Sequence, residues 1–219
     1  MSFFFAPSLC FSSWHNRRQV CRKDFFVLAA KSFFFCLLLG FIFFFELRIP
    51  PDLPPWLQGY LAVIPFWLML EMVQALLQVL WMPAGRLVPP VNVHPIFSAS
   101  VSEFWGRRWN RLFGDWLYEI CFKPFFRAPV MGLLLAFVIS GLLHELLVSL
   151  PYLVVYGKSL FGLMLVYFVI QFLAILIERK WLAASPVAGR IYCWLVVLGP
   201  APMVLNSGTL RIFQMVGSC

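Results

Sequence analysis

The chain has 219 residues, of which 62% are hydrophobic and only 12% charged, and its formal net charge is +8. Soluble domains carry roughly a quarter charged residues, so this composition excludes a soluble globular protein and indicates an integral membrane protein. The basic residues form short clusters between apolar segments, a pattern that reflects orientation in a membrane and argues against nucleic acid as a partner. The six cysteines show neither a CxxC pair nor the spacing of metal ligands, so we expect no metal site and no disulfide framework.

The amino-terminal segment 1–24 places three phenylalanines, at 3–5, ahead of its basic residues, the reverse of the order in a secretory signal. We therefore expect this segment to lie on the membrane surface. The first predicted span is 25–47, whose centre at 33–45 is almost entirely apolar. It is long enough to cross the hydrocarbon core. The proline-rich segment 48–55 then reverses the chain.

A second span is predicted at 57–81, and it carries Glu71, Gln74 and Gln78. Their spacing puts the three side chains on one helical face. That face should look into a helix bundle or a wet cavity rather than at lipid. For Gln78 we favour a plain interhelical hydrogen bond. For Glu71 a functional role is equally well supported, because a lone carboxylate is costly inside a membrane.

Prolines interrupt the chain between 83 and 95, and helical order is expected to return at Ser100. Ser100 and Glu103 have the spacing of a capping box. Over 100–122 the aromatic and aliphatic residues fall on one broad face, whereas the other face is charged: Arg108, Arg111, Asp115 and Glu119. This pattern predicts one amphipathic helix that lies in the membrane interface.

Three more spans are predicted at 128–150, 160–177 and 191–213. We expect Pro151 to end the first of these and a charged cluster at 178–180 to end the second. The last should be discontinuous, because a glycine and two prolines interrupt it: Gly199, Pro200 and Pro202. The sequence therefore predicts an all-α fold, a single membrane domain over 1–219 with five spans and one interfacial helix.

The lysines and arginines predict how these spans are oriented. With the amino terminus inside, almost all of the basic residues between the spans fall on the inner side, and the exceptions are Arg48, Lys158 and Arg211. Cytosolic loops carry such an excess of positive charge. We therefore expect the helix at 100–122 on the cytosolic side of a bacterial inner membrane or of the endoplasmic reticulum.

His144 stands inside the third predicted span. A histidine at such a position usually faces the interior of a helix bundle and is often functional, here as a general base. Ser140 lies one turn earlier on the same face and is placed to form a hydrogen bond with it. The alternative is a histidine that only joins helices. An HExxH zinc site is excluded, because the residue four positions later is Val148.

The segment before the third span groups Arg107, Arg108 and Arg111 with Asn110. The planar guanidinium groups suit phosphate, and anionic lipid headgroups are an equally good match for them. Asn110 is suited to donate a hydrogen bond to a developing oxyanion. On sequence alone, an asparagine that satisfies the local backbone is as good an interpretation.

Two short motifs carry a family resemblance: SEFWGRRWN at 102–110 and SGLLHE at 140–145. Together they resemble the signature pair of the wax synthase branch of the membrane-bound O-acyltransferase family, over residues 95–150. The resemblance implies that His144 is the catalytic base and that Asn110 helps to build the site. It also implies transfer of an acyl group from acyl-coenzyme A to a hydroxyl group, which gives an ester. Members of this family usually have more than five spans.

We therefore predict an O-acyltransferase that uses acyl-coenzyme A as co-substrate, with no cofactor. Its partners are a long-chain or small alcohol as acceptor and the surrounding membrane lipids. In this hypothesis His144 deprotonates the acceptor hydroxyl and Asn110 steadies the oxyanion. The residues predicted to bind substrate are Arg107, Arg108, Arg111, Trp105, Trp109, Glu145 and Ser140.

The hypothesis sets one geometric condition. His144 lies about 24 Å along an ideal helix from Ala128, past the membrane midplane and away from a cytosolic Asn110. Either the third span begins deeper, or the segment with Asn110 dips into the membrane. Two other interpretations stay open: a non-catalytic subunit or an inactive or incomplete relative that keeps the motifs for their structure, and a small transporter in which Glu71 and His144 line a polar path.

Overall fold

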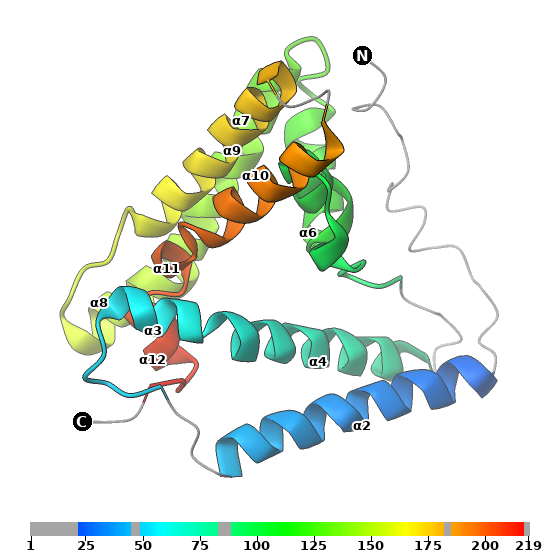
Figure 1. The fold of residues 1–219 in the computed structure, drawn as a ribbon, viewed down its shortest axis with the longest axis vertical. Helices are drawn as coiled ribbons and strands as arrows, with labels where there is room; N and C mark the ends of the chain where they lie inside the picture. The colour runs from blue at the N-terminus through cyan, green and yellow to red at the C-terminus, as the bar shows by residue number, and fades with distance from the viewer. Residues whose placement is uncertain (1–21, 45–48, 83–88, 182–184, 217–219) are drawn as a thin grey trace.

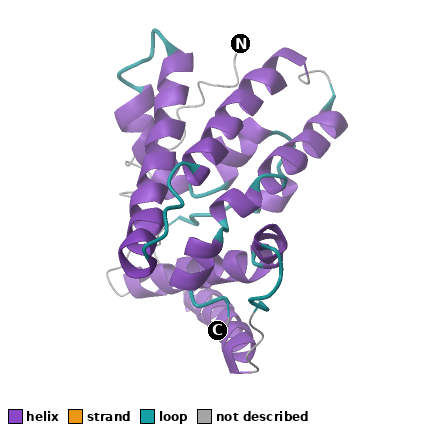
Figure 2. Cartoon of the chain, turned by 90° about the vertical axis from the view of Figure 1, so that its left-hand side faces the viewer, coloured by secondary structure: helices purple, strands orange, loops and turns teal. Residues whose placement is uncertain are grey.

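The computed structural model describes residues 22–44, 49–82, 89–181 and 185–216. Within these ranges the chain is helical, and its one β feature is an isolated parallel bridge between Ile49 and Val216. Figure 2 shows helices throughout, joined by short loops. The predicted all-α class is therefore confirmed. The predicted surface segment 1–24 lies almost entirely outside the described residues.

Among the described residues, the amino-terminal part of the fold contains three helices: α2 (Arg22–Phe44), α3 (Pro55–Leu61) and α4 (Val63–Trp81). Figure 1 shows α2 and α4 side by side and antiparallel, at a steep angle to α7, α9 and α10. The predicted proline-rich turn precedes α3. Gln58 holds this turn together, because its side-chain amide donates to the carbonyl groups of Pro50, Pro51 and Leu53 at 2.9–3.2 Å.

The segment predicted as one helix over 100–122 is two helical segments with a break between them. After a 3-10 turn, η2 (Pro95–Phe97), the first consists of α5 (Val101–Glu103) and the π-turn η3 (Phe104–Arg108). The second consists of α6 (Arg111–Leu117) and the π-turn η4 (Tyr118–Phe122). Trp109 is extended and Asn110 is left-handed, with φ 41°. Asparagine tolerates this conformation better than most residues, which helical periodicity does not reveal.

The capping box at the start of this segment is present in altered form. The Ser100 hydroxyl accepts from the amide of Glu103 at 3.0 Å, as predicted. The Glu103 carboxylate, however, accepts from the amide of Ala99 at 2.8 Å rather than from that of Ser100. The helix start is therefore fixed from both sides.

The SGLLHE motif lies in a long helical run formed by α7 (Pro129–His144), the π-turn η5 (Glu145–Ser149) and α8 (Leu150–Tyr156). The run does not end at Pro151, as the sequence predicted. The wider π-turn before the proline leaves room for a residue that has no amide hydrogen to donate. The run ends instead at Gly157, whose φ of 65° is the left-handed conformation common after a helix.

The carboxy-terminal part consists of α9 (Leu163–Trp181), α10 (Pro186–Leu198), α11 (Ala201–Val204) and α12 (Ser207–Ile212). The predicted discontinuity of the last span is present, because the chain leaves α10 at Gly199 and Pro200 and continues in two short helices. In Figure 1, α9 lies beside α7, and α10 lies next to α9.

Three of the described helical runs are long and apolar enough to cross a membrane: Val63–Leu80, Pro129–Tyr156 and Pro186–Val204. They coincide with the second, third and fifth predicted spans. The chain is an integral membrane protein by this criterion and by its composition.

The main apolar core joins the SEFWGRRWN motif to α7, α9 and α10. Its buried members include Val101, Phe104, Leu133, Phe137, Tyr167, Phe168, Phe172 and Val197. Helices α7 and α9 come close together at Gly141, where a Cβ atom would lie 2.8 Å from the Cα of Leu165. The glycine of SGLLHE therefore allows the contact that sets the spacing of these two helices.

We expect Gly141→Ala to lower the free energy of unfolding by about 1–3 kcal/mol, because the added methyl group meets the backbone of α9. Gly40→Ala is the matched control, since Gly40 is also helical and has no atom within 4 Å of its would-be Cβ. Thermal unfolding of both variants in detergent measures the difference. Equal melting temperatures for the two variants would contradict the close contact.

Candidate active site

A cleft of about 2140 Å³ lies between α4 and the core formed by α6, α7, α9 and α10. Its walls are mainly aromatic and aliphatic, and its polar groups include residues of the two sequence motifs, of α6 and η4, and of the last turn of α9. Of the nine predicted site residues, seven border this cleft: Trp105, Arg107, Trp109, Asn110, Arg111, Ser140 and His144. Arg108 and Glu145 do not border it.

His144 is partly buried, and its ring orientation is fixed on two sides. Its Nδ1 atom lies 2.7 Å from the backbone carbonyl oxygen of Ser140. A carbonyl oxygen can only accept, so Nδ1 carries the proton, and Nε2 of the neutral ring keeps a free lone pair. The Phe168 ring packs against the imidazole, with centroids 4.8 Å apart. The predicted contact with Ser140 is thus present, through its main chain rather than its hydroxyl.

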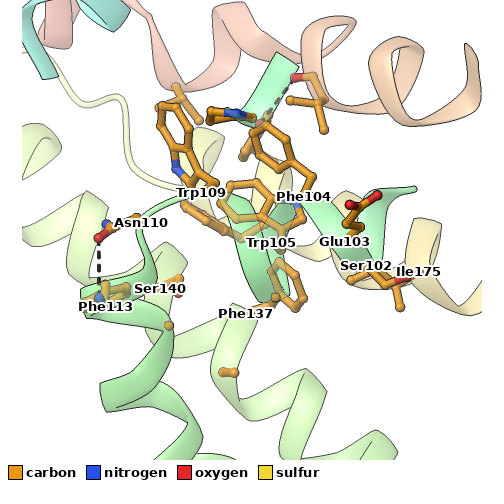
Figure 3. A pocket seen from close by; sticks show the side chains of 18 of the residues that line it. Ser102, Glu103, Phe104, Trp105, Trp109, Asn110, Phe113, Phe137, Ser140 and Ile175 are labelled. Carbon is orange, nitrogen blue, oxygen red and sulfur yellow. Dashed lines mark hydrogen bonds between the residues drawn. The ribbon is translucent and has the colours of Figure 1, made fainter. Parts of the chain in front are cut away.

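Asn110 has its side chain at the amino end of α6. Its Oδ1 atom accepts from the amide of Phe113 at 3.3 Å, and Figure 3 shows this contact at the edge of the pocket. The interpretation that Asn110 satisfies local backbone therefore holds. Because the oxygen is used in this way, the donor end of the amide, Nδ2, is the end that remains for a group in the cleft.

The two tryptophans form an aromatic wall. The indole N–H of Trp105 donates to Oε1 of Gln171 at 3.2 Å, and its ring contacts Phe137 and Phe168 at 5.8 and 5.7 Å between centroids. Phe168 therefore touches both Trp105 and His144. Trp109 stacks on Phe104 at 5.5 Å.

These contacts show how the SEFWGRRWN segment lies relative to α7. Trp105 packs against Phe137 in the middle of α7, and Phe137 precedes His144 by about two helical turns. The SEFWGRRWN segment thus reaches along α7 into the core, and both motifs border the same cleft.

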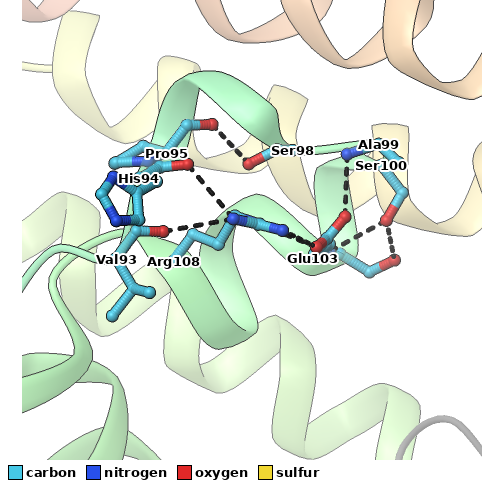
Figure 4. A network of polar contacts seen from close by, with 9 residues as sticks. Val93, His94, Pro95, Ser98, Ala99, Ser100, Glu103 and Arg108 are labelled. Carbon is cyan, nitrogen blue, oxygen red and sulfur yellow. Dashed lines mark hydrogen bonds and ion pairs between the residues drawn. The ribbon is translucent and has the colours of Figure 1, made fainter.

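The three predicted arginines have different roles in the structure. Arg107 and Arg111 border the cleft. Arg108 instead pairs with Glu103 at 2.7 Å and donates to the carbonyl groups of Val93 and His94 at 3.3 Å, as Figure 4 shows. Arg108 therefore ties the loop before the motif to the motif itself.

Two further cations that the sequence analysis did not select border the cleft, Lys123 and Arg179. Lys123 pairs with Glu119 at 2.8 Å. Burial lowers the pKa of Arg179, and the neighbouring Glu178 carboxylate opposes that shift.

Glu145 lies next to His144 in the sequence but faces α9. Its Oε1 atom accepts from the amides of Gly162, Met164 and Leu165 at 2.8, 2.9 and 3.2 Å. The carboxylate is buried, with 3% of the residue exposed. A negative charge at this place stabilises the amino end of α9, so the structure gives Glu145 a contact with the scaffold.

Three residues outside the predicted site hold the SEFWGRRWN motif in place: Gln171, Glu178 and Asn92. Gln171 is fully buried and bridges Trp105 to the carbonyl group of Val196. Glu178 accepts from the amide of Val101 and from the Ser102 hydroxyl. The sequence could have indicated Gln171, because a lone amide within an apolar helix usually has a structural or functional partner. It could not have indicated Glu178, because this residue stands in a charged cluster that equally well marks the end of a span.

The comparisons with known proteins fit this geometry. Residues 88–169 match the sequence model of the membrane bound O-acyl transferase family. The "Probable long-chain-alcohol O-fatty-acyltransferase 2" of Arabidopsis thaliana is 37% identical over 90 residues, which are 36% of this chain and 25% of that protein. The "Long-chain-alcohol O-fatty-acyltransferase" of Simmondsia chinensis is 32% identical over 130 residues, or 54% of this chain and 36% of that protein. No solved structure matches the chain.

The part of the chain that carries both motifs is therefore similar to the membrane-bound O-acyltransferase family, and the predicted resemblance to its wax synthase branch is confirmed. The aligned segments cover a quarter and about a third of the lengths of the two plant relatives.

We expect Glu145→Ala to lower the free energy of unfolding by about 1–3 kcal/mol, because three amides at the amino end of α9, one of them buried, lose their acceptor. Glu145→Gln keeps an oxygen at the same place and should lose less. Denaturation monitored by tryptophan fluorescence measures both variants. If the two variants unfold as the unaltered protein does, the carboxylate does not stabilise α9.

Proposed function

We propose that the chain is a membrane-embedded O-acyltransferase that moves an acyl group from acyl-coenzyme A to an alcohol hydroxyl and so forms an ester. One observation carries the proposal: His144, with a free Nε2, and Asn110, with a free amide donor, border one apolar cleft. The family match over residues 88–169 and the names of the two plant relatives support it.

In the proposed mechanism, Nε2 of His144 accepts the proton of the alcohol hydroxyl. The oxygen attacks the thioester carbonyl carbon, and the resulting oxyanion accepts a hydrogen bond from Nδ2 of Asn110. When the tetrahedral intermediate collapses, the carbon–sulfur bond breaks and the leaving thiolate takes the proton back from His144. The products are an ester and free coenzyme A, and His144 returns to its neutral form.

The walls of the cleft suit the two ends of an acyl-coenzyme A molecule. Phe137, Phe168 and Leu133 offer an apolar surface to an acyl chain or to a long-chain alcohol. Arg107 and Arg111 offer guanidinium groups to the phosphates of the coenzyme. The same two arginines suit the phosphate of a membrane lipid, so the donor experiment below distinguishes the two sources.

We further propose five membrane spans, at 25–47, 57–81, 128–150, 160–177 and 191–213, with the motif segment on the cytosolic side of a bacterial inner membrane or of the endoplasmic reticulum. The distribution of lysines and arginines supports this orientation. Contacts among the loop ends support it too, because Glu178 binds Val101 and Gly189 lies against Ala99. The end of α9 and the start of α10 thus share one side with the start of the motif.

The transporter interpretation receives no support from the position of Glu71. Its carboxylate contacts Lys31 and Asn92 and does not border the cleft that contains His144. The two residues therefore do not line one path.

We expect His144→Ala to lower acyl transfer by about a hundredfold or more while the fold remains intact, because the general base is lost. The assay offers purified protein radiolabelled acetyl- and palmitoyl-coenzyme A with a mixture of alcohols. His94→Asn is the matched control, since His94 does not border the cleft. Asn110→Asp keeps the cap oxygen but loses the donor, and should cost about a hundredfold to a thousandfold. Full activity in His144→Ala would rule the mechanism out.

We expect Arg111→Gln to raise the KM for acyl-coenzyme A about tenfold to a hundredfold, because a hydrogen bond to a charged group is lost. The KM for the matching acyl-pantetheine, which lacks the nucleotide phosphates, should not change. Arg127→Gln is the control, since Arg127 is exposed and does not border the cleft. An equal change for both donors would show that Arg111 does not bind the phosphates.

A further inference from the structure

The proposed mechanism leaves the polar face of α4 without a role. Glu71, Gln74 and Gln78 are 7%, 3% and 5% exposed, in a helix that is apolar enough to span a membrane. Buried polar groups in such a helix are costly unless they find partners. Two of the three residues find a common partner in the loop that precedes the SEFWGRRWN motif.

That partner is Asn92, which is itself buried. Its backbone amide donates to Oε1 of Gln74 at 2.5 Å, and its side-chain Nδ2 donates to Oε1 of Glu71 at 3.3 Å. The other oxygen of Glu71 accepts from Nζ of Lys31, on α2, at 3.1 Å. The α2–α4 pair therefore holds both the main chain and the side chain of Asn92.

The remaining polar atom of the Asn92 side chain, Oδ1, contacts a residue of the candidate site. Oδ1 of Asn92 accepts from the backbone amide of Asn110 at 2.9 Å. The neighbouring main chain pairs in the same way, because Val93 donates to the carbonyl of Arg108 and Arg111 donates to that of Val91, each at 2.8 Å. Asn92 stands in the middle of this pairing and joins it to α4.

Asn110 needs such support because of its backbone conformation. Its φ of 41° and ψ of 55° are left-handed, a conformation that asparagine tolerates better than most residues but that still persists only where neighbouring contacts hold it. The orientation of the Asn110 peptide group, which the N–H contact holds, sets the direction of its Cα–Cβ bond. The hydrogen bond to Asn92 therefore helps to set where Nδ2 of Asn110 lies in the cleft.

We propose that Asn92 is a positioning residue for Asn110, and that Glu71, paired with Lys31, orients the Asn92 amide. The inference rests on the proposed function. A carboxylate at position 71 attracts the NH₂ end of the Asn92 amide and so turns its oxygen towards Asn110. The polar face of α4 thus acts on the site through one side chain and touches no substrate.

The first test is a double-mutant cycle on purified full-length protein, with acyl transfer as the readout. Asn92→Ala should lower kcat about tenfold to a hundredfold, since misplacement of a catalytic group by about an ångström has effects of that size. The KM for acyl-coenzyme A should change less than twofold. In an Asn110→Ala background the same substitution should have no further effect, because it acts through Asn110. Equal losses in both backgrounds would overturn the proposal.

The second test places a carboxylate at position 92 and then removes the one at position 71. Asn92→Asp keeps an acceptor for Asn110 but faces the Glu71 carboxylate with another one, so kcat should fall. Adding Glu71→Gln supplies a donor to the new carboxylate and should recover most of the loss. Ser32→Ala is the control, since the Ser32 hydroxyl bonds only within α2 in the described structure, to the carbonyl of Leu28. A double variant no more active than Asn92→Asp would contradict the role of Glu71.

A third measurement separates this proposal from the proposed function. Hydrogen exchange of the Asn110 amide does not depend on catalysis, and it should be about tenfold or more faster in Asn92→Ala than in the unaltered protein. If the unaltered protein transfers no acyl group but Asn92→Ala still exchanges the Asn110 amide faster, the proposed function fails and the positioning contact stands. Unchanged exchange at Asn110 would overturn the positioning proposal, whatever the activity.

Discussion

The structure of the site depends on a break in a helix within apolar surroundings. The helical hydrogen bonds stop after the amide of Trp109, and the amides of Asn110 and Arg111 need other partners. Residues 91–93 supply them, by pairing with the main chain from Arg108 to Arg111. The break costs backbone strain and turns the Asn110 side chain towards the cleft. The loop before the motif is therefore as much a part of the site as the motif.

Buried carboxylates hold this arrangement together, and each of them binds donors of the scaffold. Glu178 accepts from the first residues of the motif, Glu145 from the first turn of α9, and Glu71 from Lys31 and Asn92. These three carboxylates therefore fix helices and loops, whereas His144 carries a proton in the proposed reaction.

The sequence predicted the class of the fold and the residues that border the cleft better than it predicted their contacts. Hydropathy and proline positions located the apolar helices, and two short motifs selected His144 and Asn110. The break at Asn110 was missed, because the apolar pattern of 100–122 continues across it and a left-handed asparagine leaves no periodic signal. The helix through Pro151 was missed because the π-turn before it has no sequence signature.

Contacts between distant parts of the chain could not be predicted from one sequence. Glu178 and Val101 are 77 residues apart, and Gln171 and Trp105 are 66 residues apart. Nothing in local periodicity pairs them. For the same reason Arg108 and Glu145, which the motifs group with the site, have their partners in a neighbouring loop and in α9.

The most direct test of this account is photolabelling of the purified protein with an acyl-coenzyme A that carries a diazirine at the end of its acyl chain, followed by peptide mapping. The account predicts labels on the apolar wall of the cleft, at Leu133, Phe137 or Phe168, which excess palmitoyl-coenzyme A prevents. Labels confined to the exposed face of α10, at Val187, Ile191 and Leu195, and insensitive to competition would contradict it. In that case the chain would meet acyl groups only as part of the surrounding lipid.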